Sequence, residues 1–158
     1  MEEITTPDQS DAEVYAECAK DLVRFATGLV GPSDAADVVS AAVVRCLSSR
    51  AWPTVRDRRA YLFRAVLNQA RAGALSRSRR EARERRASAP EAVPPTEVDP
   101  AVLAAVARLS VRQRAVVVLT YWADQDPASI AELLDVSEGT VRRHLARARS
   151  RLRRMLDA

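Results

Sequence analysis

Arginine is the residue type in this sequence with the clearest chemical capacity, and it is concentrated near the C-terminus. Of the 25 basic residues, 24 are arginines, and seven of these fall between residues 142 and 154. A guanidinium forms paired hydrogen bonds with phosphate oxygens and with base edges, which an ammonium group does not. The stretch therefore indicates nucleic-acid binding, although a GC-rich genome would also favour arginine over lysine.

A second candidate surface lies in the middle of the chain. Four residues at spacings of three, four and three share one face of an expected helix: Tyr61, Arg64, Asn68 and Arg71. A different face of the same segment is apolar: Leu62, Val66 and Ala70. Residues 77–86 then hold six arginines and two glutamates. This run is either a solvated helix end or a surface that follows phosphates.

Residues that catalysis and metal binding require are scarce. His144 is the only histidine, and the chain contains none of the motifs G-x-G-x-x-G, G-x-x-x-x-G-K-[ST] or G-x-S-x-G. Cys18 and Cys46 have no C-x-x-C spacing or histidine partner and fall on apolar helical stripes. We therefore expect two reduced core cysteines, no metal, no cofactor and no enzymatic activity.

The charge is arranged in blocks along the chain. The net charge of +4 divides into −7 for residues 1–44, +10 for 45–86, −2 for 87–110 and +3 for 111–158. The longest apolar run, 101–107, is far shorter than the roughly 20 residues that span a membrane. The acidic start of the sequence does not resemble a secretory signal. These features predict a cytoplasmic protein without membrane insertion.

Apolar spacings of three and four residues recur along the chain, which predicts an all-α fold. A first helix carries one apolar stripe over residues 14–29 and ends at Gly31. Ser33 is the expected N-cap of a second helix, whose buried side is predicted to hold Val38, Ala42, Val43, Cys46 and Leu47. A short loop over 51–57 leads to a long helix over 58–86.

Residues 87–100 interrupt the helical pattern. They hold four prolines and three acidic residues, which predicts an extended, acidic and flexible linker. The linker separates two small helical domains, residues 10–86 and residues 101–158. Domains of this size are marginal alone, so we expect each to lean on a partner.

The C-terminal segment has the layout of a helix-turn-helix. Four helices are predicted, the last two joined by a tight turn: 101–109, 111–122, 127–134 and 138–156. Ala131 is the small residue at the helix crossing, and Asp135 takes the turn position that needs a positive φ. Val141 and Leu145 anchor the second helix of the motif. Such a helix presents its N-terminal residues to major-groove base edges and its later arginines to phosphate.

Residues 109–122 and 130–152 resemble domain 4 of the sigma-70 family of RNA polymerase sigma factors. The strongest match is the turn Ser137-Glu-Gly-Thr-Val141 with its arginine-rich continuation. The resemblance extends over about residues 10–157 to the small extracytoplasmic-function (ECF) group, in which sigma domains 2 and 4 are joined by a linker. It implies sigma domain 2 over residues 10–86 and sigma domain 4 over residues 101–158.

The resemblance implies three sets of functional residues. The recognition helix would read the minus-35 promoter element with Glu138, Thr140, Arg142, Arg143 and Arg147. The long helix of domain 2 and its preceding loop would read the minus-10 element with Trp52, Tyr61, Arg64, Asn68 and Arg71. Asp34 and Asp37 would dock on the clamp of RNA polymerase.

Two of these assignments carry a further condition. Capture of an unstacked base needs hydrogen-bonding side chains beside an aromatic or apolar pocket; Trp52 fits that role and fits a core position under the loop equally well. In the docking helix, Ser40, Ala41 and Val43 stand where the family tends to have Gln, Glu and Phe. Loss of those contacts is expected to weaken polymerase binding.

The sequence thus predicts a promoter-specificity subunit that performs no chemistry itself. Its expected partners are core RNA polymerase, through the clamp and flap regions, promoter DNA, and an anti-sigma factor or other regulator. Two alternatives remain open. One is a stand-alone helix-turn-helix regulator, or a degenerate sigma-like protein, that does not productively engage polymerase. The other is a helical interaction protein with no nucleic-acid role.

Overall fold

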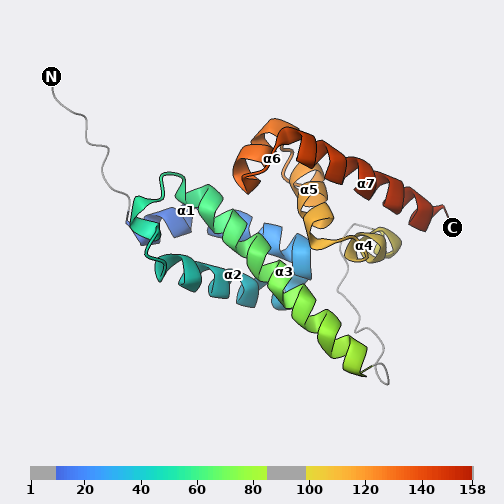
Figure 1. Cartoon of the computed structure of the whole chain (residues 1–158), viewed down its shortest axis with the longest axis horizontal. Helices are drawn as coiled ribbons and strands as arrows, with labels where there is room; N and C mark the ends of the chain where they lie inside the picture. Colours follow the sequence, from blue (N-terminus) through green and yellow to red (C-terminus); the bar gives the residue numbers. More distant parts are fainter. Residues whose placement is uncertain (1–9, 85–98, 158) are drawn as a thin grey trace.

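Seven α-helices and one short 3-10 turn make up the described part of the chain (Figure 1). A computed structural model describes residues 10–84 and 99–157, the side chains of 78–84 excepted. The elements in order are α1 (Asp11–Val30), α2 (Pro32–Leu47), η1 (Trp52–Thr54), α3 (Arg58–Glu84), α4 (Pro100–Ala107), α5 (Val111–Tyr121), α6 (Pro127–Leu134) and α7 (Glu138–Leu156). The all-α prediction is confirmed. Of these described helices, none has the length and apolar character needed to cross a membrane.

Helix α1 forms as the sequence predicts. Its capping box is complete, because the Ser10 hydroxyl accepts from the Glu13 amide at 3.3 Å and the Glu13 carboxylate accepts from the Ser10 amide at 2.8 Å. The predicted apolar stripe is the buried face: Val14, Cys18, Leu22, Phe25, Ala26 and Leu29. Gly31 ends the helix with a φ of 87°, a conformation that glycine adopts without strain.

Helix α2 departs from the prediction in two respects. It begins at Pro32 with Gly31 as its N-cap, so the assignment of Ser33 as N-cap is wrong. Proline at the first helical position supplies a preset φ and has no N–H to satisfy, which lets the helix start earlier. Its buried stripe is Ala35, Val39, Ala42 and Cys46. Val38 and Val43 are half-buried on either side of that stripe, whereas Leu47 is 45% exposed.

The helix-turn-helix forms as predicted. Ser110 completes a capping box with Gln113 at the start of α5, and Asp126 and Ser137 cap α6 and α7. Asp135 takes the left-handed conformation, with φ 54° and ψ 52°. Val141 and Leu145 are buried anchors of α7, and Ala131 is buried where α6 meets α7.

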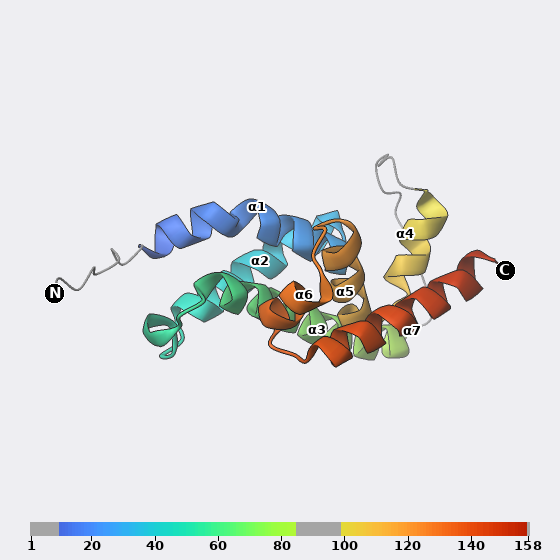
Figure 2. The ribbon, with the colours of Figure 1, turned by 90° about the horizontal axis from the view of Figure 1, so that it is seen from above.

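The two helical halves are packed on one another. Helices α1, α2 and α3 form one unit, and α5 to α7 gather on one side of it, with α4 beside the end of α7 (Figures 1 and 2). Helix α5 contacts α1 and α3, and α6 contacts α3. Each half therefore buries apolar surface against the other.

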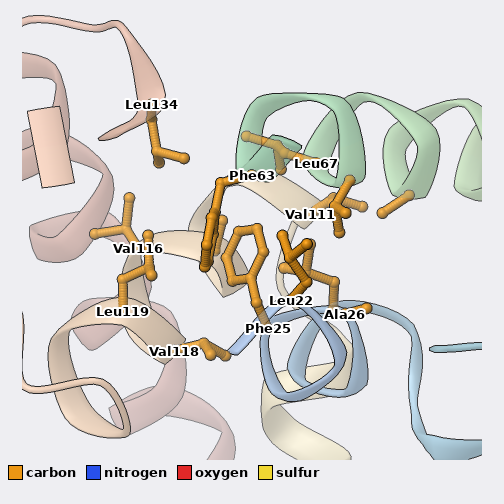
Figure 3. Packing of buried hydrophobic residues seen from close by; sticks show 14 of the residues in the cluster. Leu22, Phe25, Ala26, Phe63, Leu67, Val111, Val116, Val118, Leu119 and Leu134 are labelled. Carbon is orange, nitrogen blue, oxygen red and sulfur yellow. The ribbon is translucent and has the colours of Figure 1, made fainter. Parts of the chain in front are cut away.

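A single hydrophobic cluster runs through both halves (Figure 3). Leu22 and Phe25 of α1 and Phe63 of α3 lie opposite side chains of α5 and α6, and the rings of Phe25 and Phe63 are 5.2 Å apart between centroids. Cys18 and Cys46 are buried free thiols of the same cluster, as predicted.

The predicted linker, residues 87–100, is described only at its end. Residues 87–98 lie outside the described residues. Asp99 caps α4, and Pro100 is the first residue of that helix.

The left-handed conformation of Asp135 leads to a prediction about the stability of the fold. Asp135→Val should lower the free energy of unfolding by about 1–2 kcal/mol, because a β-branched side chain is strained at positive φ. Asp135→Asn is the matched control and should be nearly neutral, since asparagine tolerates the left-handed region. Chemical denaturation of both variants measures the difference. Equal stabilities for the two variants would contradict the backbone argument.

Candidate nucleic-acid interface

Helix α7 positions the predicted minus-35 residues on its first turns. The Ser137 hydroxyl accepts from the Thr140 amide at 3.1 Å and lies 2.8 Å from the Thr140 hydroxyl, which fixes the start of the helix. Its buried stripe, Val141, Leu145 and Ala148, turns the arginines outward. Arg142, Arg143 and Arg147 are all exposed. The structure therefore brings the predicted set together on one helix end.

Contacts within α7 preset some of these side chains. Arg142 pairs with Glu138 one turn earlier, and the Arg143 guanidinium donates to the Thr140 hydroxyl at 3.3 Å. An exposed pair of this kind contributes only a few tenths of a kcal/mol to helix stability. Arg149 lies two turns after Arg142 on α7, and its Nε donates to the Tyr121 hydroxyl at 2.7 Å. It does not join the predicted base-reading set.

Three of the five predicted minus-10 residues line one groove. Arg64, Asn68 and Arg71 of α3 form one wall. The opposite wall belongs to the helix-turn-helix and includes Thr140 and His144. The groove measures about 280 Å³, and its floor is apolar: Leu67, Val116, Leu134 and Val141. Arg112 of α5 also lines it and was not singled out from the sequence.

The other two predicted minus-10 residues form a separate cluster. Trp52 is only 4% exposed, and its Nε1 donates to an Asp11 carboxylate oxygen at 2.7 Å. The Tyr61 ring lies 6.0 Å from the Trp52 ring, and the Arg58 guanidinium is 5.4 Å from the Trp52 centroid. Of the two roles left open for Trp52, the structure shows the core position under the loop.

The predicted docking residues lie at the start of α2. Asp34 pairs with Arg77 of α3 at 2.6 Å, and both side chains are about half exposed, so the pair adds little stability. Asp37, Ser40 and Ala41 are exposed on the same helix. Val44 is 64% exposed on the same side of the helix, and the sequence analysis did not single it out. The spacing of Asp37, Ser40 and Val44 is the signal that could have found it.

Electrostatics at the groove concern mainly the lone histidine. Burial lowers the pKa of His144 below the usual range, and the neighbouring charges of Arg112, Arg143 and Arg147 lower it further. His144 is therefore neutral at pH 7 and adds no charge to the arginine surface. Among the side chains that the structure describes, residues 10–77 and 99–157, no three of His, Cys, Asp or Glu group closely enough to hold a metal ion.

Comparison with known proteins identifies the family of this chain. The family model for sigma-70, region 4 matches residues 100–152. The RNA polymerase sigma-E factor of Streptomyces coelicolor is 34% identical over 154 residues, covering 92% of this chain and 86% of the relative. The ECF RNA polymerase sigma factor SigL of Mycobacterium tuberculosis is 33% identical over 164 residues, covering 91% and 87%. The chain belongs to the ECF group of the sigma-70 family.

A solved structure shares the fold of this ECF sigma factor. It is the sigma factor RpoE of Bartonella quintana in complex with the anti-sigma factor NepR, with a TM-score of 0.66. The match covers 91% of this chain and 94% of that one at 20% identity. At this identity the likeness establishes the fold alone. It spans nearly the whole length of the ECF chain and so includes helices of both halves.

The lone histidine of the ECF sigma factor allows a direct pH test. Because its folded-state pKa is lowered, the unfolded chain takes up the proton first as the pH falls. The stability tied to His144 is therefore complete above about pH 6.5 and declines below it. NMR titration of the single imidazole should give a pKa below the usual histidine value, and His144→Gln should flatten this part of the stability profile. An imidazole that titrates at or above the usual value would contradict the assignment.

Proposed function

We propose that this ECF sigma factor binds core RNA polymerase and directs transcription initiation from promoters with minus-35 and minus-10 elements. The observation that carries the proposal is the exposed arginine-rich end of α7 in a chain that belongs to the ECF group. Nucleotide addition is the work of the core enzyme, and this chain supplies specificity without catalysis. Its place of action is the cytoplasm, where that enzyme transcribes.

Helix α7 is proposed as the minus-35 reader. Its N-terminal turns present Glu138, Thr140, Arg142, Arg143 and Arg147. Arginine pairs with the O6 and N7 acceptors of guanine, glutamate accepts from cytosine N4, and threonine contacts either a base edge or a thymine methyl. Arg143 lies about 200° around the helix from the buried Val141, so it points away from the protein. The Glu138 contact orients Arg142 beside it.

Helix α3 is proposed as the minus-10 reader through Arg64, Asn68 and Arg71. Asn68 and Arg71 are exposed, and an amide beside two guanidinium groups can hold an unstacked base and the phosphates next to it. Tyr61 is half-buried against the Trp52 ring. We assign this pair to the support of the loop before α3, with Trp52 as a positioning residue rather than a DNA contact.

Helix α2 is proposed as the docking element for the polymerase clamp. Asp34 and Asp37 provide the charge, and the exposed Val44 provides apolar contact on the same surface. The C-terminal half is proposed to contact the flap region. The structural neighbour was solved with an anti-sigma factor, which supports an anti-sigma factor or similar regulator as a further partner.

The minus-35 assignment predicts the effect of two arginine substitutions. Arg143→Ala should lower the preference of the holoenzyme for a cognate minus-35 element by about 1–3 kcal/mol. Arg147→Ala should weaken binding at all sequences and reduce the slope of log affinity against log salt by about 1. Promoter binding by reconstituted holoenzyme, measured over a salt series, tests both.

Arg24→Ala is the control for that experiment, because it removes the same charge from an exposed site on α1. It should leave promoter preference and salt slope unchanged. Unchanged preference in Arg143→Ala, with an unchanged slope in Arg147→Ala, would remove the assignment. Tight promoter binding by the free chain that core polymerase does not enhance would favour the stand-alone regulator instead.

The docking assignment predicts a loss of polymerase affinity in Val44→Glu. A carboxylate placed within an apolar contact must lose water without a partner, which costs at least about 1–3 kcal/mol. Val23→Glu is the matched control, because Val23 is an exposed apolar residue of α1. Affinity for core polymerase should fall at least about fivefold in Val44→Glu alone. An equal affinity for the two variants would place the clamp contact elsewhere.

A further inference from the structure

We propose that the groove between α3 and the helix-turn-helix is a binding site of the free protein for an adenine mononucleotide. The proposal goes beyond the proposed function, because it assigns a small-molecule ligand to a chain whose proposed partners are all macromolecules. Three properties of the groove carry it: an excess of positive charge, polar side chains without partners, and an apolar floor.

Three guanidinium groups line the groove from two sides. Arg64 and Arg71 belong to α3, and Arg112 belongs to the first turn of α5. Of the described residues that line the groove, only Asp135 has a carboxylate, so its lining carries two more positive than negative charges. Like charges gathered at one hollow repel one another. A phosphate dianion relieves this repulsion, and guanidinium groups bind phosphate oxygens through paired hydrogen bonds.

The polar side chains of the groove are available to a ligand. Within the part of the chain whose side chains the structure describes, no hydrogen bond or ion pair is made by five side chains that line it: Arg64, Asn68, Arg71, Arg112 and His144. Arg142, on the outer side of α7, pairs instead with Glu138. A ligand in the groove can therefore be bound without breaking an internal contact, which is the arrangement of a preformed site.

The floor of the groove suits a planar, weakly polar group. Leu67, Val116, Leu134 and Val141 form it, and all four are buried. A nucleobase can lie on such a floor while its phosphate faces the guanidinium groups. The volume of about 280 Å³ is close to the lower end of the roughly 300–1,000 Å³ typical of small-molecule pockets. The groove therefore has room for a mononucleotide but not for a dinucleotide.

Asn68 favours adenine among the bases. An asparagine amide can pair with both N6 and N7 of adenine, because it offers one acceptor and one donor side by side. Asn68 lies one turn from Arg64 and one turn from Arg71 on α3. Base recognition and phosphate binding are thus combined on one wall. Adenosine 5′-monophosphate (AMP) is the ligand that meets all of these conditions.

Titration calorimetry of the free, full-length chain tests the site. AMP should bind at least about tenfold more tightly than adenosine or inorganic phosphate, because each of these supplies only part of the contacts. Inosine 5′-monophosphate has an oxygen in place of the N6 amino group and should bind at least about fivefold more weakly than AMP. Inorganic phosphate that binds as tightly as AMP would indicate an adventitious ion only and would overturn the proposal. Equal affinities for AMP and its inosine counterpart would overturn the assignment of adenine.

Two arginine substitutions locate the ligand. Arg112→Gln removes a groove charge that is not among the proposed promoter contacts, and it should weaken AMP binding at least about tenfold. Arg108→Gln is the matched control, because Arg108 is also exposed but lines a different hollow with Arg151 and Arg154. It should leave the affinity for AMP unchanged. Weaker binding in Arg108→Gln, or unchanged binding in Arg112→Gln, would overturn the groove as the site.

His144 provides a second readout, because this lone imidazole lies on the wall of the groove. A bound phosphate places negative charge beside it and should raise its pKa, which NMR titration measures. Uncharged adenosine should leave that pKa unchanged. The charged groups that act on the imidazole or line the same groove are Arg64, Arg71, Arg112, Asp135, Arg143 and Arg147. A His144 pKa that is the same with and without saturating AMP would overturn the site.

One consequence rests on the proposed function. Arg64, Asn68 and Arg71 are the proposed minus-10 readers, and the same side chains cannot contact a nucleotide and promoter DNA at once. Radiolabelled AMP bound to the free chain should therefore be released when core polymerase and promoter DNA are added, with core polymerase and promoter alone as the blank. Retention of AMP by the chain in an active promoter complex would overturn this competition. If no promoter complex forms, the proposed function fails, and the titrations of the free chain still decide the ligand site.

Discussion

The packing of α5 between the two halves is the interaction on which the rest of the structure depends. Residues 115–119 of this helix are buried one after another. A helix that is apolar on every side must be covered on every side. Helices α6 and α7 cover part of α5, and α1 and α3 cover the rest. The hydrophobic core of this small ECF sigma factor is therefore shared rather than duplicated, which addresses the limited burial available to domains of this size.

The shared core determines what the free protein can present to its partners. The arginine-rich outer side of α7 and the proposed docking surface of α2 both remain exposed. The proposed minus-10 surface of α3, by contrast, faces the helix-turn-helix across a narrow groove. The shared core therefore fixes the position of the helix-turn-helix relative to α3 in the free protein.

Local features of this fold could be predicted from the sequence because each depends on neighbouring residues. The buried stripe of α1, the capping box at Ser110 and the left-handed Asp135 all follow from spacing and residue type. The start of α2 was mispredicted because serine was preferred as a cap over the glycine that precedes Pro32. The buried face of α2 was also mispredicted, because valines on both sides of the helix made more than one face apolar.

Features that join distant segments were beyond the reach of sequence patterns. The burial of Trp52 depends on Asp11, which lies 41 positions earlier. The groove exists only because α3 and the helix-turn-helix meet, and Arg112 lines it for the same reason. The run of consecutive apolar residues in α5 was a signal of this contact. A helix covered on one side alone would carry polar residues on its other side. The family resemblance implied a role for Asn68 but did not show that it lies across a groove from Thr140 of α7.

Single-molecule energy transfer between α3 and α6 tests the central claim most directly, namely that one shared core holds the two halves of the free protein together. Dyes placed through Leu75→Cys and Ala128→Cys sit on exposed positions of two helices that pack together in the free protein. The free protein should show one population of high transfer. A population of low transfer in the free, folded protein would contradict the account.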